Sequence, residues 1–373
     1  MIWIAALLCA ASSGWIVVGL VALWSATRRR PRRNAGVALL PATVLKPLCG
    51  ADADLEASLE TFFMQDHPDY QIVFGVERAD DPALAVVERL VARHPSRSCR
   101  IVVTAAAARG HNPKVRNLRA MLGAADPDLV VVSDSNVRVP AHYLRELVEV
   151  YVSEPDVGLV TNIVAGVGER SLAGALECIQ LCGFCAIGSA VPTLMGDAAV
   201  VGKSMLLSRA RLEALGGLAR VADVLAEDYV LGKTVQHAGF GVRIAPTVVE
   251  NVVGPLTLRA HVERHLRWAL IRFRLRPQAF LLEPLASPLA LLPVAFAAFG
   301  PAAFPWAFAA MLVRDVGGWL ILRGPRGVAA AALLGLVREV VGLGVWLAAP
   351  LTRHVVWRGH RVRVGAGTLL YST

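Results

Sequence analysis

Long apolar segments at both ends constrain this chain more than any other feature of its sequence. The segment from Met1 to Trp24 contains only apolar and small residues, and the chain turns apolar again at 279–350. A run of about 20 apolar residues is enough for a helix to cross a bilayer. The region between them, residues 37–278, has the mixed polarity and the length of a globular domain with its own core. The sequence therefore predicts a water-soluble domain tethered to a membrane at both ends.

The N-terminal apolar segment, residues 1–26, predicts an uncleaved anchor rather than a signal peptide. A signal peptide carries its positive charge before the apolar run. Here nothing basic precedes the run, and five arginines follow it: Arg28, Arg29, Arg30, Arg32 and Arg33. Because basic flanks remain on the cytoplasmic side of a membrane, the domain that follows is expected in the cytoplasm.

The C-terminal apolar region, residues 279–350, predicts two further spans, Ala303–Leu322 and Val328–Leu347. Three prolines interrupt Phe280–Gly300, so this segment is expected to be interfacial or re-entrant. Two full spans return the basic tail, residues 351–373, to the cytoplasm, as its arginines require.

Two charged pairs, Arg314-Asp315 and Arg338-Glu339, lie inside these predicted spans. Ionisable groups that face lipid are energetically costly, so these residues either contact a polar headgroup or pair with one another across helices. We expect the pairing across helices.

The chain carries a formal net charge of +9, which predicts anionic partners. Its basic residues cluster beside apolar segments, as at 264–276, and this favours lipid headgroups and nucleotide phosphates over nucleic acid. Cys178, Cys182 and Cys185 lie close together, but no histidine pair or second cysteine pair stands at finger-like spacing. Buried thiols on a helix are therefore favoured over a structural zinc site.

The middle of the chain alternates Val- and Ile-rich stretches with amphipathic stretches. This pattern predicts an α/β domain with a largely parallel sheet, whose ligand site lies beyond the carboxyl ends of the strands. The expected strands are 42–45, 71–76, 100–104, 129–133, 158–162, 204–208 and 242–244, and the expected helices are 55–63, 83–93, 115–122, 143–152 and 228–237.

Three groups of acids follow strands or open helices. Asp80 and Asp81 follow one strand, and either caps the next helix or accepts hydrogen bonds from a nucleotide. Asp134 ends a buried strand, as a turn cap or as a ligand for Mg²⁺ or Mn²⁺. Glu227 and Asp228 open a helix, where a carboxylate either complements the helix dipole or acts as a general base.

A basic segment follows these acids. Arg264 and Arg267 are three residues apart, so on a helix they share a face that can hold phosphate, with Trp268 beside them. A basic interfacial helix that meets anionic lipid is the alternative, and both interpretations can hold together.

Taken in order, these segments resemble the ceramide glucosyltransferase family (family 21 of the GT-A-fold glycosyltransferases), including its bacterial and hopanoid-modifying relatives. The resemblance covers nearly the whole chain, and its most specific parts are 112–114 and Asp134-Ser135. The Arg-Trp pair is shared with processive polysaccharide synthases. The matching segments are 45–50, 80–82, 110–118, 134–135, 227–229, 267–268 and 357–359.

The resemblance implies an α/β, GT-A (Rossmann-like) domain that transfers a sugar with inversion from a UDP-sugar to a membrane lipid hydroxyl. In the family, Asp80 or Asp81 would contact the uridine, and Asn112 and Lys114 would contact the nucleotide-sugar. Asp134 would hold a divalent cation, Mg²⁺ or Mn²⁺, on the diphosphate.

The remaining roles implied by the resemblance concern the reaction itself. Asp228 would be the catalytic base, while Arg264, Arg267 and Trp268 would close on the pyrophosphate and the acceptor. Two positions depart from the family pattern. Asn136 replaces the second acid of a D-x-D motif, and Arg264 replaces the glutamine of Q-x-x-R-W.

Glucose transfer to ceramide is the expected reaction, and N-acetylglucosamine transfer to a hopanoid is the main alternative. A processive synthase fits less well, because the apolar tail is short for a polymer channel. A non-catalytic membrane scaffold would fit better without Asp134 and Asp228, but both are present. The expected location is the bacterial inner membrane, with the catalytic domain facing the cytoplasm.

Overall fold

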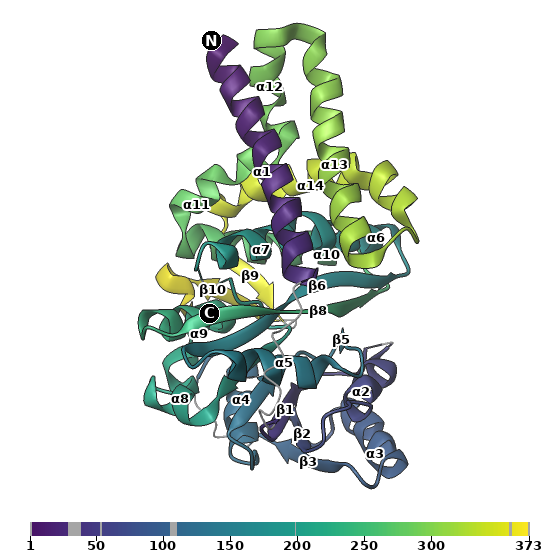
Figure 1. Ribbon diagram of the computed structural model, residues 1–373, viewed down its shortest axis with the longest axis vertical. Coiled ribbons are helices and arrows are strands. Elements are labelled where there is room, and N and C mark those ends of the chain that lie inside the picture. The colour runs from purple at the N-terminus through teal and green to yellow at the C-terminus, as the bar shows by residue number, and fades with distance from the viewer. Residues whose placement is uncertain are drawn as a thin grey trace. The chain divides into compact units, whose positions relative to one another are not determined.

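The computed structural model describes residues 2–28, 39–52, 54–104, 110–197, 199–357 and 360–371. Its chain divides into two compact units, whose elements are labelled in Figure 1. We call Ala26–Val164 with Pro192–Val252 the sheet unit, and Met1–Ser25 with Ala165–Val191 and Val253–Thr373 the helical unit. Among the predicted features, 29–33 and 358–359 lie outside the described residues.

The sheet unit is built on a mixed sheet of eight strands. The strands are β1 (Ala42–Pro47), β2 (Tyr70–Val76), β3 (Ser98–Val103), β4 (Leu129–Val132), β5 (Val137–Arg138), β6 (Val157–Glu169), β7 (Met205–Ser208) and β8 (Gly241–Gly254). Their order is β3-β2-β1-β4-β7-β6-β8-β5. The first four are parallel, as predicted. The prediction of a largely parallel sheet is wrong for the other half, where β7 is antiparallel to β4 and β6, and β5 is antiparallel to β8.

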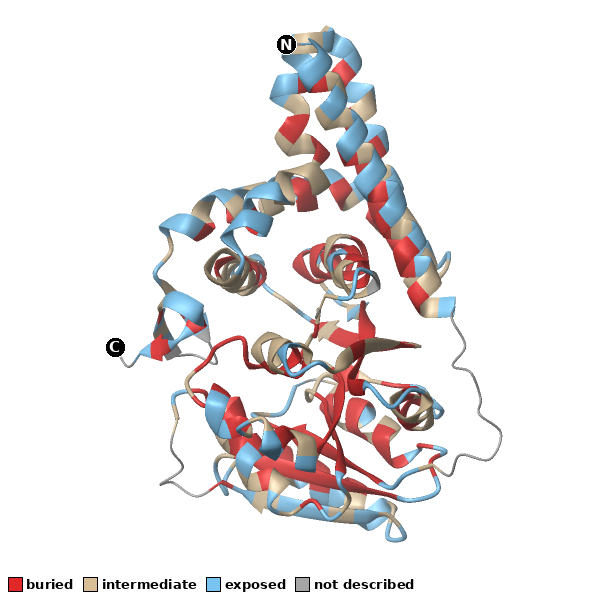
Figure 2. Cartoon of the chain, turned by 60° about the vertical axis from the view of Figure 1, so that its left-hand side comes forward, coloured by how far each residue is buried: buried red, intermediate tan, exposed pale blue. Residues whose placement is uncertain are grey.

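Helices cover both faces of this sheet. They are α2 (Leu55–Phe63), α3 (Ala83–Arg93), α4 (Pro113–Leu122), α5 (Tyr143–Ser153), α8 (Arg209–Ala214) and α9 (Glu227–His237). Successive side chains of a strand point to opposite faces. Val44 and Val131 therefore join a core with α2, α3 and α5, whereas Leu45 and Val130 join a second core with α4, α8 and α9. The central strands are buried on both faces, as Figure 2 shows in red.

The helical unit contains the apolar segments. Its helices are α1 (Ile2–Arg28), α6 (Leu172–Gln180), α7 (Ala186–Leu194), α10 (Leu258–Leu275), α11 (Pro277–Leu282), α12 (Pro288–Phe299), α13 (Ala303–Arg323) and α14 (Val328–Ala348), with a small sheet of β9 (His354–Trp357), β10 (His360–Val364) and β11 (Leu370–Tyr371). A π-helical turn, Leu181–Cys185, joins α6 to α7. Cys178 and Cys182 are buried there as free thiols.

Four helical segments of the described chain are long and apolar enough to cross a membrane: Ile2–Arg28, Leu172–Thr193, Pro288–Arg323 and Val328–Leu351. The segment at 172–193 was not among the predicted spans, and it is largely buried within the protein. The proline-rich segment at 280–300 forms α11, a 3₁₀ turn and α12. With 12 residues, α12 is about 18 Å long and thus shorter than a hydrocarbon core of about 30 Å.

The four charged residues inside α13 and α14 form one buried network, as predicted. Arg314 contacts Asp315 at 2.9 Å and Glu339 at 2.7 Å, while Arg338 contacts Asp315 at 2.8 Å and Glu339 at 2.7 Å. All four side chains are almost fully buried. The predicted pairing across helices is therefore confirmed, and the balanced charges lower the cost of burying these groups.

Candidate active site

The carboxyl ends of β1 and β4 meet at one edge of the sheet, where the chain leaves β4 through Ser133 and Asp134. Lys46, near the end of β1, is fully buried. Its ammonium donates to the Ser133 hydroxyl at 3.3 Å and to the Asp134 carbonyl oxygen at 2.5 Å. Burial holds the pKa of Lys46 well below its ordinary value. This lysine fixes the loop that presents the Asp134 carboxylate.

The Asp134 carboxylate lies between two ammonium groups. Its Oδ1 is 2.9 Å from Lys114 Nζ, and its Oδ2 is 3.0 Å from Lys203 Nζ. Burial raises the pKa of Asp134, but the two ammonium groups outweigh it and hold the pKa below its ordinary value. Lys114 Nζ also lies 2.9 Å from Glu227 Oε1. The site is therefore an alternating cluster of positive and negative groups, in which two ammonium groups lie beside the Asp134 carboxylate.

The second carboxylate of interest, Asp228, lies in the first turn of α9. Its Oδ2 accepts a hydrogen bond from the Gly202 N–H at 2.6 Å, and its Oδ1 accepts one from the Tyr229 N–H at 2.7 Å. Burial and the neighbouring Glu227 carboxylate raise the pKa of Asp228 to about 6, against the opposing effect of Lys114. A carboxylate with a pKa near neutrality is suited to accept a proton during a reaction.

The loop before β7 supplies residues that the sequence analysis missed. Gly202 permits the close approach of two charged groups, because a Cβ there would lie 2.9 Å from Lys114 Nζ and 3.0 Å from Asp228 Oδ2. Lys203 is the second partner of Asp134. These residues reach the site because β7 runs antiparallel to β4, so that its first residues lie beside the end of β4.

Asn112 caps α4 and ties it to the segment before α9. Its Oδ1 accepts the Val115 N–H at 3.1 Å, and its Nδ2 donates to the Val224 carbonyl at 2.7 Å and to Glu227 at 3.4 Å. The side chain is fully buried. In this structure Asn112 therefore positions Lys114 and Glu227 rather than presenting its own amide to a ligand.

The two acids after β2 differ from each other. Asp81 accepts hydrogen bonds from the Gly50 N–H at 3.1 Å and the Ala83 N–H at 2.9 Å, so it links two loops and opens α3. Asp80 is exposed and pairs with Arg78. Of the two candidates for a nucleotide contact, Asp81 is the one held in place by the fold.

Asn136, which replaces the second acid of a D-x-D motif, is anchored to the sheet. Its Nδ2 donates to Asn251 Oδ1 and to the Val252 carbonyl, both at 3.1 Å, and its Oδ1 accepts from Lys203 at 2.9 Å. Asn136 therefore orients Lys203 toward Asp134.

The predicted basic residues lie on α10 of the helical unit. Arg264 donates to Glu177 at 3.1 Å, and Arg267 donates to the Val356 carbonyl at 3.0 Å. Burial and the neighbouring Arg264 lower the pKa of Arg267 to about 10, which leaves it charged at neutral pH. Trp268 meets the ring of His265 edge-on, with centroids 5.0 Å apart.

A buried cluster on α6 and α10 offers ligand atoms for a metal. Glu177, His261 and His265 place one donor atom each within 4.8 Å of one another. Both histidines lie 2.7 Å from Glu177 Oε2, and Arg264 occupies Oε1. Hydrogen bonds thus occupy both oxygens of the Glu177 carboxylate, and the positive charge of the Arg264 guanidinium beside it disfavours a divalent cation.

The structure brings together four of the predicted site residues in the sheet unit. These are Asn112, Lys114, Asp134 and Asp228, joined by Lys203 and Glu227. Asp80 and Asp81 stand on the loop after β2, and Arg264, Arg267 and Trp268 belong to the helical unit.

Comparisons with known proteins agree with this architecture. The chain is similar to Ceramide glucosyltransferase 1 of Caenorhabditis elegans, with 26% identity over 243 residues, 65% of this chain and 52% of that protein. It is also similar to Ceramide glucosyltransferase of Komagataella phaffii, with 34% identity over 110 residues, 29% of this chain and 22% of that protein. The chain thus spans about half the length of the first relative.

A solved structure has the same fold. It is the mannosyltransferase PcManGT from Pyrobaculum calidifontis in complex with GDP-Man and Mn²⁺, with 20% identity, a TM-score of 0.50 and coverage of 93% of this chain and 97% of that one. The fold is therefore a mixed α/β fold of the GT-A type. The sequence profile of Glycosyl transferase family 21 matches residues 4–370, nearly the whole chain. The protein belongs to Glycosyl transferase family 21.

Proposed function

We propose that this protein is a membrane-bound, inverting glycosyltransferase that moves glucose from UDP-glucose to a hydroxyl of ceramide. The observation that carries the proposal is the site at the sheet edge. There, Asp228, with its pKa raised to about 6, lies beside the cluster of Lys114, Asp134 and Lys203. Asp228 is suited to take a proton, and the two lysines, together with a divalent cation on Asp134, would hold a diphosphate.

In the proposed reaction, the acceptor hydroxyl loses its proton to Asp228 as its oxygen attacks the anomeric carbon of the sugar. The bond from that carbon to the diphosphate oxygen breaks, and its electron pair leaves with UDP. Lys114 and Lys203 stabilise the negative charge that develops on the diphosphate. Gly202 and Tyr229 orient the Asp228 carboxylate through their N–H groups.

A divalent cation fits this site with Asp134 as its single carboxylate ligand. Mg²⁺ commonly binds through one or two carboxylates together with water and substrate phosphates. Asp134 is ionised, and its side chain is 25% exposed, so an oxygen becomes available when a lysine turns to the phosphates. When bound, the cation would supply further charge neutralisation for the departing diphosphate.

Several observations support a lipid acceptor. The described chain has four helical segments that can cross a membrane, and the similar proteins of C. elegans and K. phaffii are ceramide glucosyltransferases. Basic residues beside the apolar segments, such as Arg28, support a catalytic unit that faces the cytoplasm.

One assay tests the proposal. The purified full chain is incubated with UDP-glucose, UDP-galactose or UDP-N-acetylglucosamine and with ceramide, diacylglycerol or a hopanoid, and products are read by mass spectrometry. We expect glucosylceramide to dominate. Transfer of N-acetylglucosamine to the hopanoid alone would contradict the assigned substrates, and the absence of any glycolipid with every pair would contradict the reaction.

The rate of transfer is expected to fall in acid. Asp228 acts only when deprotonated, and its pKa is raised to about 6. The rate should therefore be constant above that pH and fall about ten-fold per pH unit below it. Measurement of kcat/KM from about pH 4.5 to 8, the range in which most proteins stay folded, checks this prediction. A profile without an acid limb would argue against Asp228 as the base.

A further inference from the structure

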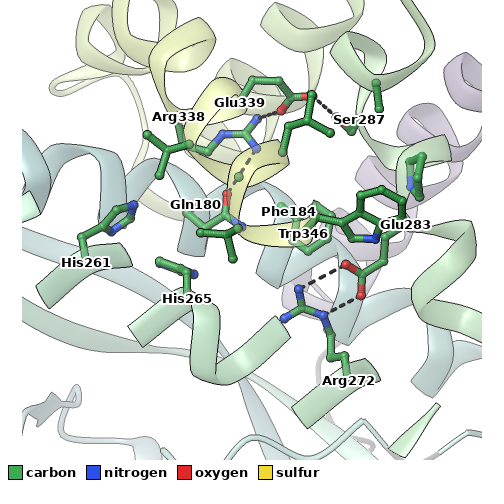
Figure 3. A pocket seen from close by; sticks show the side chains of 16 residues that line it. Gln180, Phe184, His261, His265, Arg272, Glu283, Ser287, Arg338, Glu339 and Trp346 are labelled. Atoms are coloured by element: carbon green, nitrogen blue, oxygen red, sulfur yellow. Dashed lines mark hydrogen bonds and ion pairs between the residues drawn. The ribbon is translucent and has the colours of Figure 1, made fainter. Parts of the chain in front are cut away.

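A pocket in the helical unit is not used by the reaction described above. It is lined by α10, α12, α14, the end of α6 with its π-helical turn, and the turn after α11. The cavity volume of the pocket is about 50 Å³, within about 620 Å³ of empty space that includes open solvent. Figure 3 shows Phe184 and Trp346 between Gln180 and Arg338 on one side and the Arg272–Glu283 ion pair on the other. The lining residues that matter most are Gln180, Phe184, Arg272, Glu283, Arg338 and Trp346.

The charges in the lining cancel. Arg272 contacts Glu283 through two nitrogens, at 2.6 and 3.1 Å. Arg338 contacts Glu339 at 2.7 Å. A ligand with a phosphate or carboxylate needs an excess of positive charge, often an unpaired arginine. A lining with paired charges instead favours an uncharged ligand that carries hydroxyl or amide groups.

One buried donor in this lining is unused. Arg338 is 3% exposed and donates to Gln180 at 3.2 Å and to Asp315 at 2.8 Å. Its Nε–H has no hydrogen-bond partner among the described residues. Buried donors in folded proteins are normally paired. This Nε–H is buried, and an acceptor atom of a ligand that reached it would satisfy it.

The apolar part of the pocket is held in place by a close helix contact. Phe184 belongs to the π-helical turn, and such turns are frequent at functional sites. Helix α13 packs directly on this turn because Gly318 has no Cβ, which would collide with the carbonyl oxygen of Cys182. Trp346 is fixed by a hydrogen bond from Nε1 to the Phe280 carbonyl at 3.0 Å.

Helix α14, which lines the pocket, also presents an apolar outer surface. Leu336, Val337, Val340 and Leu347 on this helix are exposed. Exposed apolar side chains on a helix long enough to span a bilayer are suited to contact lipid chains. This surface faces away from the pocket lining, but it places the pocket among helices that contact lipid, where a ligand with an alkyl chain and a polar head is expected.

We propose that this pocket binds the acceptor lipid by an uncharged head that bears amide and hydroxyl groups, as in ceramide. Arg338 and Gln180 are its polar contacts, and Phe184 and Trp346 pack against the adjoining part of the chain. This assignment rests on the proposed function, since it names the place where that reaction holds its acceptor.

Two glycines of α14 provide a matched test. Gly342 lines the pocket, and a Cβ there would have Arg338 Nη1 as its nearest neighbour, at 3.9 Å. Gly344 is exposed, has nothing within 4 Å of a Cβ, and is not part of the lining. Gly342→Leu should raise the KM for ceramide at least about ten-fold, because the new side chain fills the pocket. Gly344→Leu should leave the KM unchanged, and Gly342→Ala should have an intermediate effect.

The affinity for UDP-glucose, measured by calorimetry without lipid, is the internal control. It should be the same in all three variants and in the unmodified protein. Normal transfer to ceramide by Gly342→Leu would overturn the pocket assignment and leave the proposed function standing. A loss of UDP-glucose affinity in Gly342→Leu as large as its rise in the KM for ceramide would also overturn the assignment, because the substitution would then not act on the acceptor alone.

A second measurement does not depend on transfer. A ceramide with a photoactivatable group at the start of its acyl chain should label peptides that contain Phe184 or Trp346. Excess unlabelled ceramide should compete, and excess phosphatidic acid should not. Labelling without any glycolipid formation would refute the proposed function but support the pocket, whereas labelling confined to other peptides would refute the pocket.

Discussion

Asp134→Ala should reduce sugar transfer by at least about three orders of magnitude, and EDTA should have a comparable effect on the unmodified protein. The substitution removes the carboxylate that we propose as ligand for the divalent cation. It also leaves Lys114 and Lys203 without the group that holds them 2.9 and 3.0 Å away on either side. Two ammonium groups would then repel each other in a largely buried site. Initial rates with UDP-glucose and ceramide, with and without EDTA and added Mn²⁺, check this prediction.

A surface carboxylate provides the control for this experiment. Asp66 pairs with Arg145 at 2.7 Å in an exposed ion pair, and such pairs contribute little to stability. Asp66→Ala should therefore retain activity. Full activity of the unmodified protein in EDTA would refute the cation, even if Asp134→Ala were inactive. In that case the two lysines alone would neutralise the diphosphate.

The sequence predicted the local elements of the sheet unit well. Helices α2 and α3 have the predicted bounds, because each is a clean amphipathic stretch between polar turns. The direction of β6, β7 and β8 was not predictable in the same way. A buried strand has the same Val- and Leu-rich composition whether its neighbours run parallel or antiparallel, and the connections decide the direction. The two-residue strand β5 is too short to leave a pattern.

Local sequence patterns likewise identified some residues of the site and missed others. Asp134 and Asp228 were identifiable because an acid that ends a buried strand or opens a helix is conspicuous in a sequence. Lys46 and Lys203 were missed, since a lysine in or before a strand is usually solvent-exposed. Their function follows only from the pairing of β1 with β4 and of β4 with β7, which brings both lysines to Asp134.

The division of the chain into two units also depends on contacts between helices that are far apart in the sequence, which local patterns do not predict. Residues 172–193 fall inside the region that was predicted as the catalytic domain, yet they pack with the apolar C-terminal helices. Glu177 and Gln180 lie on this segment and contact α10 and α14. An amphipathic pattern predicts that a helix buries one face, but it does not identify the partner.

Asp228→Asn should reduce kcat by about two to four orders of magnitude and leave the affinity for UDP nearly unchanged. Asparagine has the shape of aspartate but cannot take the proton of the acceptor hydroxyl. It also has only one acceptor oxygen, so one of the two hydrogen bonds from Gly202 and Tyr229 is lost. This loss should lower the free energy of unfolding by about 1–2 kcal/mol, which thermal unfolding of the purified variant can measure.

The neighbouring carboxylate decides whether Asp228 is the base. Glu227 is held by Lys114 at 2.9 Å and by Asn112 at 3.4 Å, so Glu227→Gln disturbs the position of Lys114. It should weaken UDP binding, measured by calorimetry, while the pH profile of kcat/KM keeps its acid limb near pH 6, because the limb belongs to Asp228. Removing the Glu227 charge should move that limb slightly toward lower pH, since this carboxylate is one cause of the raised pKa of Asp228. If Glu227→Gln instead abolished the limb and Asp228→Asn retained it, Glu227 would be the group that takes the proton.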